Sequence, residues 1–317
     1  MHTEKVAFYS EGYRLAGVLH LPDQEVSSPR PVIVEGPGWL AVACGSAPSS
    51  LSEAYHEGFV RAGFAVLNFD YRGFGLSEGP GGWVRPADQI EDIFSAVTFV
   101  ETRNELDPRR IGLYGQGGTG GGNAICAAAC DERIRCVIVQ SAVADGAEWL
   151  RRMRREHEWV EFCQRVAANR RRRVRDNEDE LVDPREELMV AAPERKSEGL
   201  RHGTDTRVGS AFHLASAEAL LRYRPIDVVH RIAPRALLIT SVEDDVVTPE
   251  DHAKALYERA GTPKRLIRQT GVRHYESYRR NLPVLLPQFT AWYERFLEPL
   301  SSVTARTGEP AEGLLNV

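Results

Sequence analysis

Three short stretches of the chain carry residue types whose spacing could support acid–base or nucleophilic chemistry. In IGLYGQGGTGGGNA (111–124), an apolar run meets glycines and then small helix formers, which predicts a strand that breaks sharply into a helix. Enzymes that carry a nucleophile on such a turn use the pattern Gly-x-Ser-x-Gly, and Gly117 stands where the serine would be. Further along, ALLITSVEDDVVTPE (236–250) predicts a buried strand and an acidic loop, in which Asp244 is best aligned to orient a histidine. RQTGVRHYESY (268–278) then presents His274 just after the last strand, so the chain predicts a histidine and a carboxylate beside a turn that lacks its hydroxyl.

Both members of this pair have other interpretations. A lone histidine near a C-terminal helix is usually a surface or packed residue, but His274 follows a TGV turn downstream of the acidic loop, which favours a functional role. The place of Asp244 is open to a slip of one residue, because Glu243 and Asp245 adjoin it.

The elements that must position these residues alternate along the chain. Helical patterns of about 10–15 residues lie between the later β-rich runs, which predicts a parallel sheet with helices on both faces. The first two runs, joined by a Glu-Gly turn, predict an antiparallel hairpin at the sheet edge. The runs that predict strands are 5–10, 14–22, 30–36, 64–73, 110–115, 135–142, 235–241 and 264–270.

Residues 147–213 interrupt this alternation, because they are dense in arginine and acidic residues and carry no strand signal. An apolar stripe at helical spacing predicts one charged helix; it consists of Trp149, Met153, Val160 and Cys163. The basic run 170–173 invites an RNA-binding interpretation, but acidic residues follow at 178–180, which favours a solvated helical cap. We therefore expect a core of residues 1–146 and 214–300, a helical cap insertion at 147–213 and a flexible tail at 301–317.

Composition excludes several classes of protein. The 317 residues are 42% hydrophobic and 27% charged, and the net charge of −5 argues against a nucleic-acid binder. No apolar run approaches the length of a membrane span, and the N-terminal residues carry no signal-peptide core. The five cysteines are an odd number without metal-site spacing, which predicts reduced thiols and a cytoplasmic location. GQGGTG (115–120) lacks the features of a phosphate-binding or dinucleotide loop, so neither a metal nor an organic cofactor is implied.

The sequence resembles the α/β-hydrolase superfamily, in its dienelactone-hydrolase and X-prolyl-peptidase (cocaine-esterase-like) branch. The order of turn, acidic loop and histidine is that of this fold, a mostly parallel central sheet flanked by helices. The resemblance covers roughly residues 5–145 and 215–297 and leaves the charged insertion, where such families place a variable cap. It departs from the family at Gly117, which replaces the serine. The segments that carry it are AGFAVLNFDYRGFGLSEG (62–79), LDPRRIGLYGQGGTGGG (106–122), RIRCVIVQSAVADG (133–146) and GVRHYESY (271–278).

The resemblance implies roles for individual residues. Asp244 would accept a hydrogen bond from one ring nitrogen of His274 and leave the other nitrogen to move protons. The N–H of Gly118 and that of Trp39, in the loop EGPGWLAV (35–42), would form an oxyanion hole. Backbone donors do not depend on a side chain, so this hole would survive the loss of the serine.

Three further residues could take part in the chemistry. Glu35, at the end of the third predicted strand, could be a second acid or base, or could cap a neighbouring loop. Cys44 and Thr119 could attack in place of the serine, but a buried cysteine and a threonine whose side chain points away from the pocket are simpler interpretations.

Several functions remain open from the sequence. The first is an enzyme that uses His274 and Asp244 without a covalent intermediate, to hydrolyse an ester, lactone or C–C bond of a small carbonyl substrate with activated water. Lyase, decarboxylase or cyclase chemistry on the same site is an alternative. A serine hydrolase with an inactivating Ser-to-Gly change at 117 and a non-catalytic ligand-binding protein are two others. A homodimer is also left open, because many such relatives dimerise.

Overall fold

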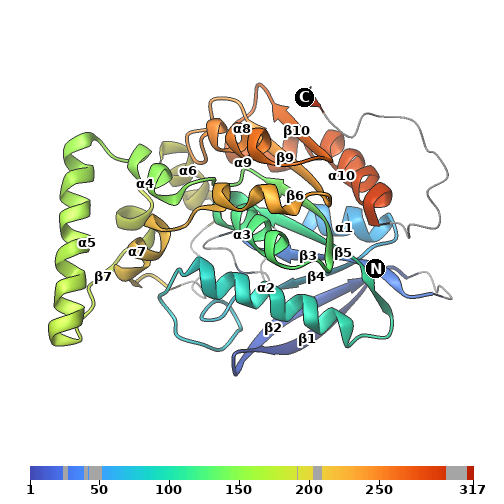
Figure 1. The fold of residues 1–317 in the computed structure, drawn as a ribbon, viewed down its shortest axis with the longest axis horizontal. Helices are drawn as coiled ribbons and strands as arrows, with labels where there is room; N and C mark the ends of the chain where they lie inside the picture. Colours follow the sequence, from blue (N-terminus) through green and yellow to red (C-terminus); the bar gives the residue numbers. More distant parts are fainter. Residues whose placement is uncertain (24–27, 39–41, 43–51, 191, 203–208, 298–312) are drawn as a thin grey trace.

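A nine-stranded sheet forms the centre of the computed structural model, which describes residues 1–23, 28–38, 42, 52–190, 192–202, 209–297 and 313–317 (Figure 1). The strand order is β1-β2-β4-β3-β5-β6-β9-β10-β11. β1 and β2 form the predicted antiparallel hairpin at one edge, β2 is antiparallel to β4, and the remaining pairs are parallel. The strands are β1 His2–Ser10, β2 Tyr13–Leu21, β3 Arg30–Gly36, β4 Ala65–Phe69, β5 Leu106–Gln116, β6 Ile134–Gln140, β9 Ala236–Val242, β10 Lys264–Gln269 and β11 Leu314–Asn316.

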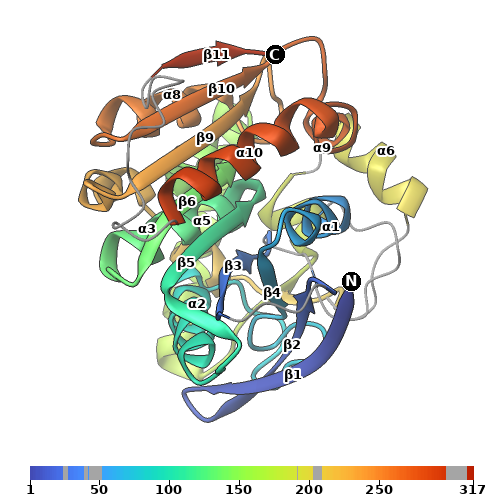
Figure 2. The same ribbon diagram turned by 90° about the vertical axis from the view of Figure 1, so that its right-hand side faces the viewer.

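Helices cover both faces of the sheet, as the alternation predicts (Figures 1 and 2). Successive residues of one strand point to opposite faces. Val34 therefore belongs to the apolar cluster that includes residues of α2, α3 and α8, while Ile33 belongs to the cluster that includes residues of α1 and α10. This arrangement confirms the predicted α/β-hydrolase fold. The helices around the sheet are α1 Glu53–Arg61, α2 Pro86–Glu101, α3 Gly117–Cys130, α8 Glu250–Arg259, α9 His274–Arg280 and α10 Leu282–Leu297, with 3-10 turns at Pro225–Asp227 and Val229–Ile232. Among the helices that the structure describes, none is both long and apolar enough to cross a lipid bilayer.

The segment between β6 and β9 carries helices that lie outside the sheet. In Figure 1, the long helix α5 stands at the left edge of the molecule, beyond α4 and α7. The expectation that 147–213 holds no strand is wrong in one detail, because β7 pairs antiparallel with β8. Each of these strands is two residues long, too short to show a period in the sequence. The elements are α4 Gly146–Arg152, α5 Glu156–Asp176, β7 Leu181–Val182, a π-helical turn Pro184–Leu188, α6 Pro193–His202, β8 Phe212–His213 and α7 Ala215–Leu221.

The end of the chain differs from the predicted flexible tail at 301–317. Leu314–Asn316 forms β11, which pairs in parallel with β10 along the edge of the sheet. The backbone of Val317 extends this contact, donating to Arg268 and accepting from Thr270. An edge strand such as β10 has unpaired backbone N–H and C=O groups that can bind a neighbouring strand. A segment of three residues can pair with these groups even though it is too short to show a hydrophobic pattern in the sequence. Residues 301–312 lie outside the described part of the chain.

Candidate active site

The turn between β5 and α3 has the geometry of a nucleophile-bearing turn. β5 ends at Gln116 and α3 begins at Gly117, whose φ of +70° lies in the left-handed region. Among the described residues, a Cβ atom placed on Gly117 would have only the Cα atom of Gly38 within reach, at 4.0 Å. The turn therefore keeps the shape and the open space of a serine position, but presents a hydrogen atom there.

The glycines around this turn are required by close backbone approach. A Cβ on Gly115 would lie 2.7 Å from the carbonyl oxygen of Gly120, and a Cβ on Gly120 would lie 2.6 Å from that of Pro37. Both distances are too short for a side chain. The end of β5, the start of α3 and the loop after β3 therefore meet through their backbones.

The acid partner of His274 is Asp245. Its Oδ2 atom lies 2.7 Å from Nδ1 of His274, and both residues are buried. Its Oδ1 atom accepts hydrogen bonds from the backbone N–H groups of Val247 (2.7 Å) and Thr248 (3.0 Å). These three bonds fix the carboxylate and orient the imidazole.

The prediction of Asp244 as the orienting acid is thus wrong by one residue. Asp244 is exposed and takes a left-handed conformation with φ of +53°. In this turn the side chain that points inward is that of Asp245, which then closes a local turn with the N–H groups two and three residues on.

His274 is held at the N-terminus of α9. Its carbonyl oxygen accepts from the Ser277 hydroxyl at 2.7 Å, and its ring packs edge-on against Tyr275 and Tyr278. With Nδ1 directed at Asp245, Nε2 is the ring nitrogen left for proton transfer.

Three side chains that sequence reasoning did not assign to the site surround the residue after the turn. A Cβ on Gly118 would approach Val143 Cγ2 at 2.9 Å, and Thr248 Oγ1 and Trp149 Cζ2 at 3.4 Å each. Trp149 also donates from Nε1 to the carbonyl oxygen of Val247 at 2.8 Å. The turn, the acidic loop and the start of the inserted segment therefore meet at one place. The helical stripe had identified Trp149 only as an apolar residue.

Of the two expected oxyanion donors, the structure describes Gly118 but not Trp39. Gly118 lies in the first turn of α3, where backbone N–H groups have no acceptor within the helix. Trp39 lies outside the described residues, as does Cys44. Thr119 is 1% exposed, so it is buried in the packing of α3.

Glu35 lies at the end of β3 as expected, but its partner is a histidine of α1. The Glu35 Oε2 atom lies 2.6 Å from Nε2 of His56, and both residues are buried. Within the described residues, no hydrogen bond or ion pair joins Glu35 to His274 or Asp245. Its catalytic role stays a prediction, and the structure adds His56, whose place on a predicted helix had given no signal.

The inserted segment is fastened to the core beside the acidic loop. His252 of α8 accepts a hydrogen bond at Nδ1 from the N–H of Ala144 (2.9 Å), and its Nε2 lies 2.5 Å from Oε2 of Glu148 in α4. Burial lowers the pKa of His252, although the charge of Glu148 opposes this shift. The neutral ring therefore links α4 to α8.

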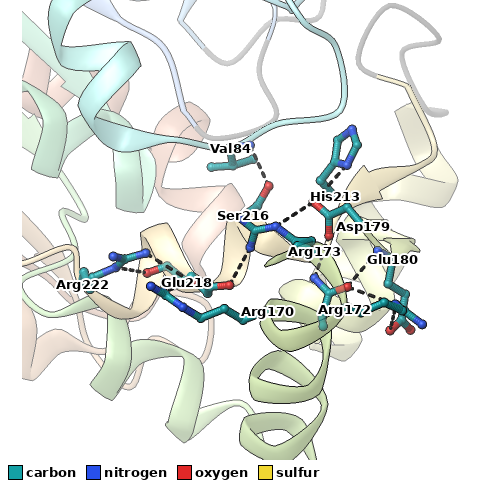
Figure 3. A network of polar contacts seen from close by, with 11 residues as sticks. Val84, Arg170, Arg172, Arg173, Asp179, Glu180, His213, Ser216, Glu218 and Arg222 are labelled. Atoms are coloured by element: carbon teal, nitrogen blue, oxygen red, sulfur yellow. Dashed lines mark hydrogen bonds and ion pairs between the residues drawn. The ribbon is translucent and has the colours of Figure 1, made fainter. Parts of the chain in front are cut away.

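A second attachment joins α5 to α7 through a polar network (Figure 3). Glu218 accepts hydrogen bonds from Arg170 (2.7 Å) and Arg173 (2.6 Å), and Ser216 accepts from the N–H of Val84 (3.0 Å). An open cavity of about 490 Å³ lies beside this network, between Trp83 and the C-terminal end of α5. It includes neither the Gly117 turn nor the His274–Asp245 pair. Among the described residues, no cluster of three metal-binding side chains occurs.

Comparison with known proteins identifies a family that matches most of the chain. The serine aminopeptidase S33 family model matches residues 48–275. An uncharacterised 31.7 kDa protein in the traX–finO intergenic region of Escherichia coli is 29% identical over 85% of this chain and 90% of its own length.

Two named relatives match a smaller part of the chain. The quorum-quenching protein AidA of Acinetobacter baumannii is 35% identical over 44% of each chain. The thiohydrolase aneE of Aspergillus aculeatus is 40% identical over 40% of this chain and 37% of its own. Among solved structures, the α/β-hydrolase GrgF from Penicillium superposes with a TM-score of 0.78 at 21% identity, covering 94% of this chain and 99% of that one. DcsB, solved with a substrate analogue, gives 0.79 at 19% identity, with 93% and 99% covered. At this identity the structural likeness shows the fold alone.

Proposed function

Because the chain belongs to the serine aminopeptidase S33 family of α/β-hydrolases and is an enzyme of the hydrolase class, we propose that it hydrolyses a small carbonyl substrate without forming an acyl-enzyme. His274 and Asp245 supply the acid–base chemistry, and a water molecule takes the place of the absent serine hydroxyl. The observation that carries this proposal is the intact, buried His274–Asp245 pair in a chain whose Gly117 offers no nucleophile.

The space at Gly117 suits a water molecule. A serine side chain there would bring two non-hydrogen atoms, and in the part of the chain that the structure describes only Gly38 Cα comes within 4.0 Å of the first of them. In the proposed step, water attacks the carbonyl carbon while Nε2 of His274 accepts one of its protons. The same nitrogen then returns the proton to the leaving group as the tetrahedral intermediate collapses.

Backbone donors stabilise the charge that develops on the carbonyl oxygen. The N–H of Gly118 supplies one hydrogen bond and the N–H of Trp39 is proposed as the second. In serine hydrolases, what survives loss of the nucleophile is about 10³–10⁴-fold acceleration over water, so a site that works without a serine starts from that level.

The names of the relatives guide the choice of substrate. A thiohydrolase and a quorum-quenching protein are among them, so small thioesters and lactones are the compounds to test first, followed by oxygen esters and C–C ketones. The place of the chain in the dienelactone-hydrolase and X-prolyl-peptidase branch belongs to the same proposal.

Turnover of this panel by His274→Ala tests the proposal. We expect the variant to lose nearly all activity, while His157→Ala, which changes an exposed histidine of α5, keeps it. Oxygen from ¹⁸O-labelled water must enter the acid product. A product without the label would indicate lyase or cyclase chemistry, and full activity of His274→Ala would refute the role of the pair.

A further inference from the structure

The start of α6, in the inserted segment, lies beside the start of α9, which begins at His274 (Figures 1 and 2). Two hydrogen bonds join the helices at Tyr275. Glu194 Oε1 accepts from the backbone N–H of Tyr275 at 3.1 Å, and Arg195 Nε donates to the Tyr275 hydroxyl at 3.1 Å. The inserted segment therefore brings an acidic and a basic side chain to the residue next to the histidine of the acid–base pair.

One side chain, that of Tyr275, separates Arg195 from His274. The rings of Tyr275 and His274 pack edge-on with their centroids 4.9 Å apart, and the hydroxyl group of the same tyrosine holds the guanidinium. The inserted segment also reaches the Gly117 turn, because a Cβ on Gly118 would lie 3.4 Å from Cζ2 of Trp149. A molecule of a few carbon atoms bound at the acid–base pair can therefore extend to Arg195.

Arg195 has no carboxylate partner among the described residues. Its hydrogen bond goes to a neutral phenol, and its Nη1 atom is buried without a hydrogen-bond partner in that part of the chain. Glu194 binds the N–H of Tyr275 instead, and neighbouring residues of a helix do not face each other. Glu276 of α9 pairs with Arg280 at 3.1 Å. A partly buried charge without a counter-charge is unfavourable, so the guanidinium is suited to an anion from outside the chain.

Other arginines of the inserted segment are fully matched. Arg165, Arg170 and Arg173 of α5 each have a glutamate oxygen within 2.7 Å. Arg154 donates instead to three backbone carbonyl oxygens. Arg195 follows neither pattern, although it lies nearer than any of these four along the chain to the helix that carries the histidine and contacts that helix directly.

We propose that Arg195 binds a carboxylate on the acyl part of the substrate and so selects anionic carbonyl compounds for the His274–Asp245 pair. With Nε held by the Tyr275 hydroxyl, both Nη atoms remain, and these form a planar fork that matches the two oxygens of a carboxylate. No bond is made or broken at Arg195. The inference rests on the proposed function, since it names the class of substrate for that reaction.

Titration calorimetry with unreactive amides tests this selection without turnover. The N-propyl monoamides of succinate, glutarate and adipate carry a free carboxylate, and the N-propyl amides of butyrate, pentanoate and hexanoate are their neutral counterparts. We expect the wild type to prefer the charged amide of at least one length. Arg195→Gln should weaken binding of that amide by about 10- to 100-fold and change binding of its neutral counterpart by no more than about twofold.

Lys196→Gln is the matched control, because it removes one positive charge from the next residue of α6. The Lys196 side chain is exposed and pairs with Glu186 at 3.3 Å, so this variant should keep the preference of the wild type. Arg195→Lys retains the charge without the planar fork and should recover part of the preference. A wild type without preference at any length, or equal losses in Arg195→Gln and Lys196→Gln, would overturn the proposal.

Kinetics separate this inference from the proposed hydrolysis. On a thioester whose acyl chain ends in a carboxylate, Arg195→Gln should raise KM and affect kcat less, whereas His274→Ala abolishes turnover. If no compound of the panel were hydrolysed, the preference for charged amides and its loss in Arg195→Gln could still be measured. If hydrolysis occurred without any such preference, the role of Arg195 alone would be refuted.

Discussion

At the scale of single residues, the proposed chemistry depends on Gly117. Its φ of +70° and the open space at its Cβ position are what a serine on this turn requires. The Asp245–His274 pair that would activate such a serine is also in place. On the proposed function, the hydroxymethyl group is what Gly117 lacks, so adding this group tests the rest of the site.

Gly117→Ser should create a serine that reacts with fluorophosphonate probes. A left-handed non-glycine residue costs about 1–2 kcal/mol, so we expect a comparable loss of unfolding free energy together with a gain of covalent labelling. Gly117→Ala carries the same strain without the hydroxyl and should stay unlabelled. An unlabelled Gly117→Ser that is folded would show that His274 does not reach this position. If the Gly117→Ser variant were labelled and also turned over substrates that the wild-type protein does not, the chain would be a serine hydrolase inactivated at residue 117.

Neighbouring carboxylates at 244 and 245 should behave differently. Asp245→Asn presents an amide in place of an acceptor to His274 Nδ1, and the same change in serine proteases lowers turnover by about 10⁴. Asp244→Asn changes an exposed side chain and should leave turnover within about twofold of the wild type. Rates of both variants on one substrate from the panel give the answer. Equal losses would mean that the loop, and not the identity of the acid, controls activity.

This pair of residues shows how far sequence can locate a site. Chain order fixed the histidine and the loop that carries its partner, because both follow from the fold. Which side chain of the loop points towards His274 depends on which residue takes the left-handed conformation. Nothing in the sequence Glu-Asp-Asp (243–245) distinguishes Asp244 from Asp245 in this respect. The contact between Glu35 and His56 was likewise invisible, since 21 positions separate them.

At the scale of elements, ion pairs between residues far apart in the sequence join helix α5 of the inserted segment to α7. The basic run at 170–173 was expected to be balanced by the acidic residues that follow it. Glu180 does pair with Arg165 and Arg172, and Asp179 pairs with Arg173, but Arg170 and Arg173 also pair with Glu218 on α7. The local charge pattern therefore predicted that nearby acidic residues balance the basic run. It could not identify Glu218, the partner on α7, because that contact depends on the packing of α5 against α7.

Glu218→Gln should loosen α5 from α7. The Glu218 side chain is 10% exposed and pairs with three partly exposed arginines, Arg170, Arg173 and Arg222. We therefore expect a loss of about 1–2 kcal/mol in unfolding free energy. Limited proteolysis should also cleave faster within 147–213. Asp176→Asn, which removes an exposed pair with Arg175, is the control and should change neither. Unaltered proteolysis in Glu218→Gln would show that apolar packing alone holds the helix.

At the scale of the whole molecule, the site joins segments from across the chain. The Gly117 turn ends β5, the Asp245 loop follows β9 and His274 follows β10, so each stands at the carboxyl end of a strand, where open α/β sheets place their ligands. Sequence could predict this convergence because it follows from parallel topology. It could not predict that His252 of α8 would fasten the inserted segment beside the same site, since a buried histidine leaves no periodic signal.

The His252 contact gives the molecule a dependence of stability on pH. Burial lowers the pKa of His252, and also that of His20, below the model-compound value of 6.5. The unfolded chain therefore binds these protons at a higher pH than the folded chain does, and each histidine lowers stability as the pH falls through 6.5 towards its folded pKa. Each unit by which a pKa is lowered corresponds to about 1.4 kcal/mol.

His252→Asn should flatten this part of the stability profile. Asparagine keeps an acceptor for the N–H of Ala144 but has no proton to gain, so unfolding free energy measured by urea titration should fall less between pH 7 and pH 5 than in the wild type. His157→Asn, at an exposed position of α5, should leave the profile unchanged. If the unfolding free energy of His252→Asn fell with pH as steeply as that of the wild type, acid would destabilise the protein at another site. The contact between α4 and α8 would then not depend on pH.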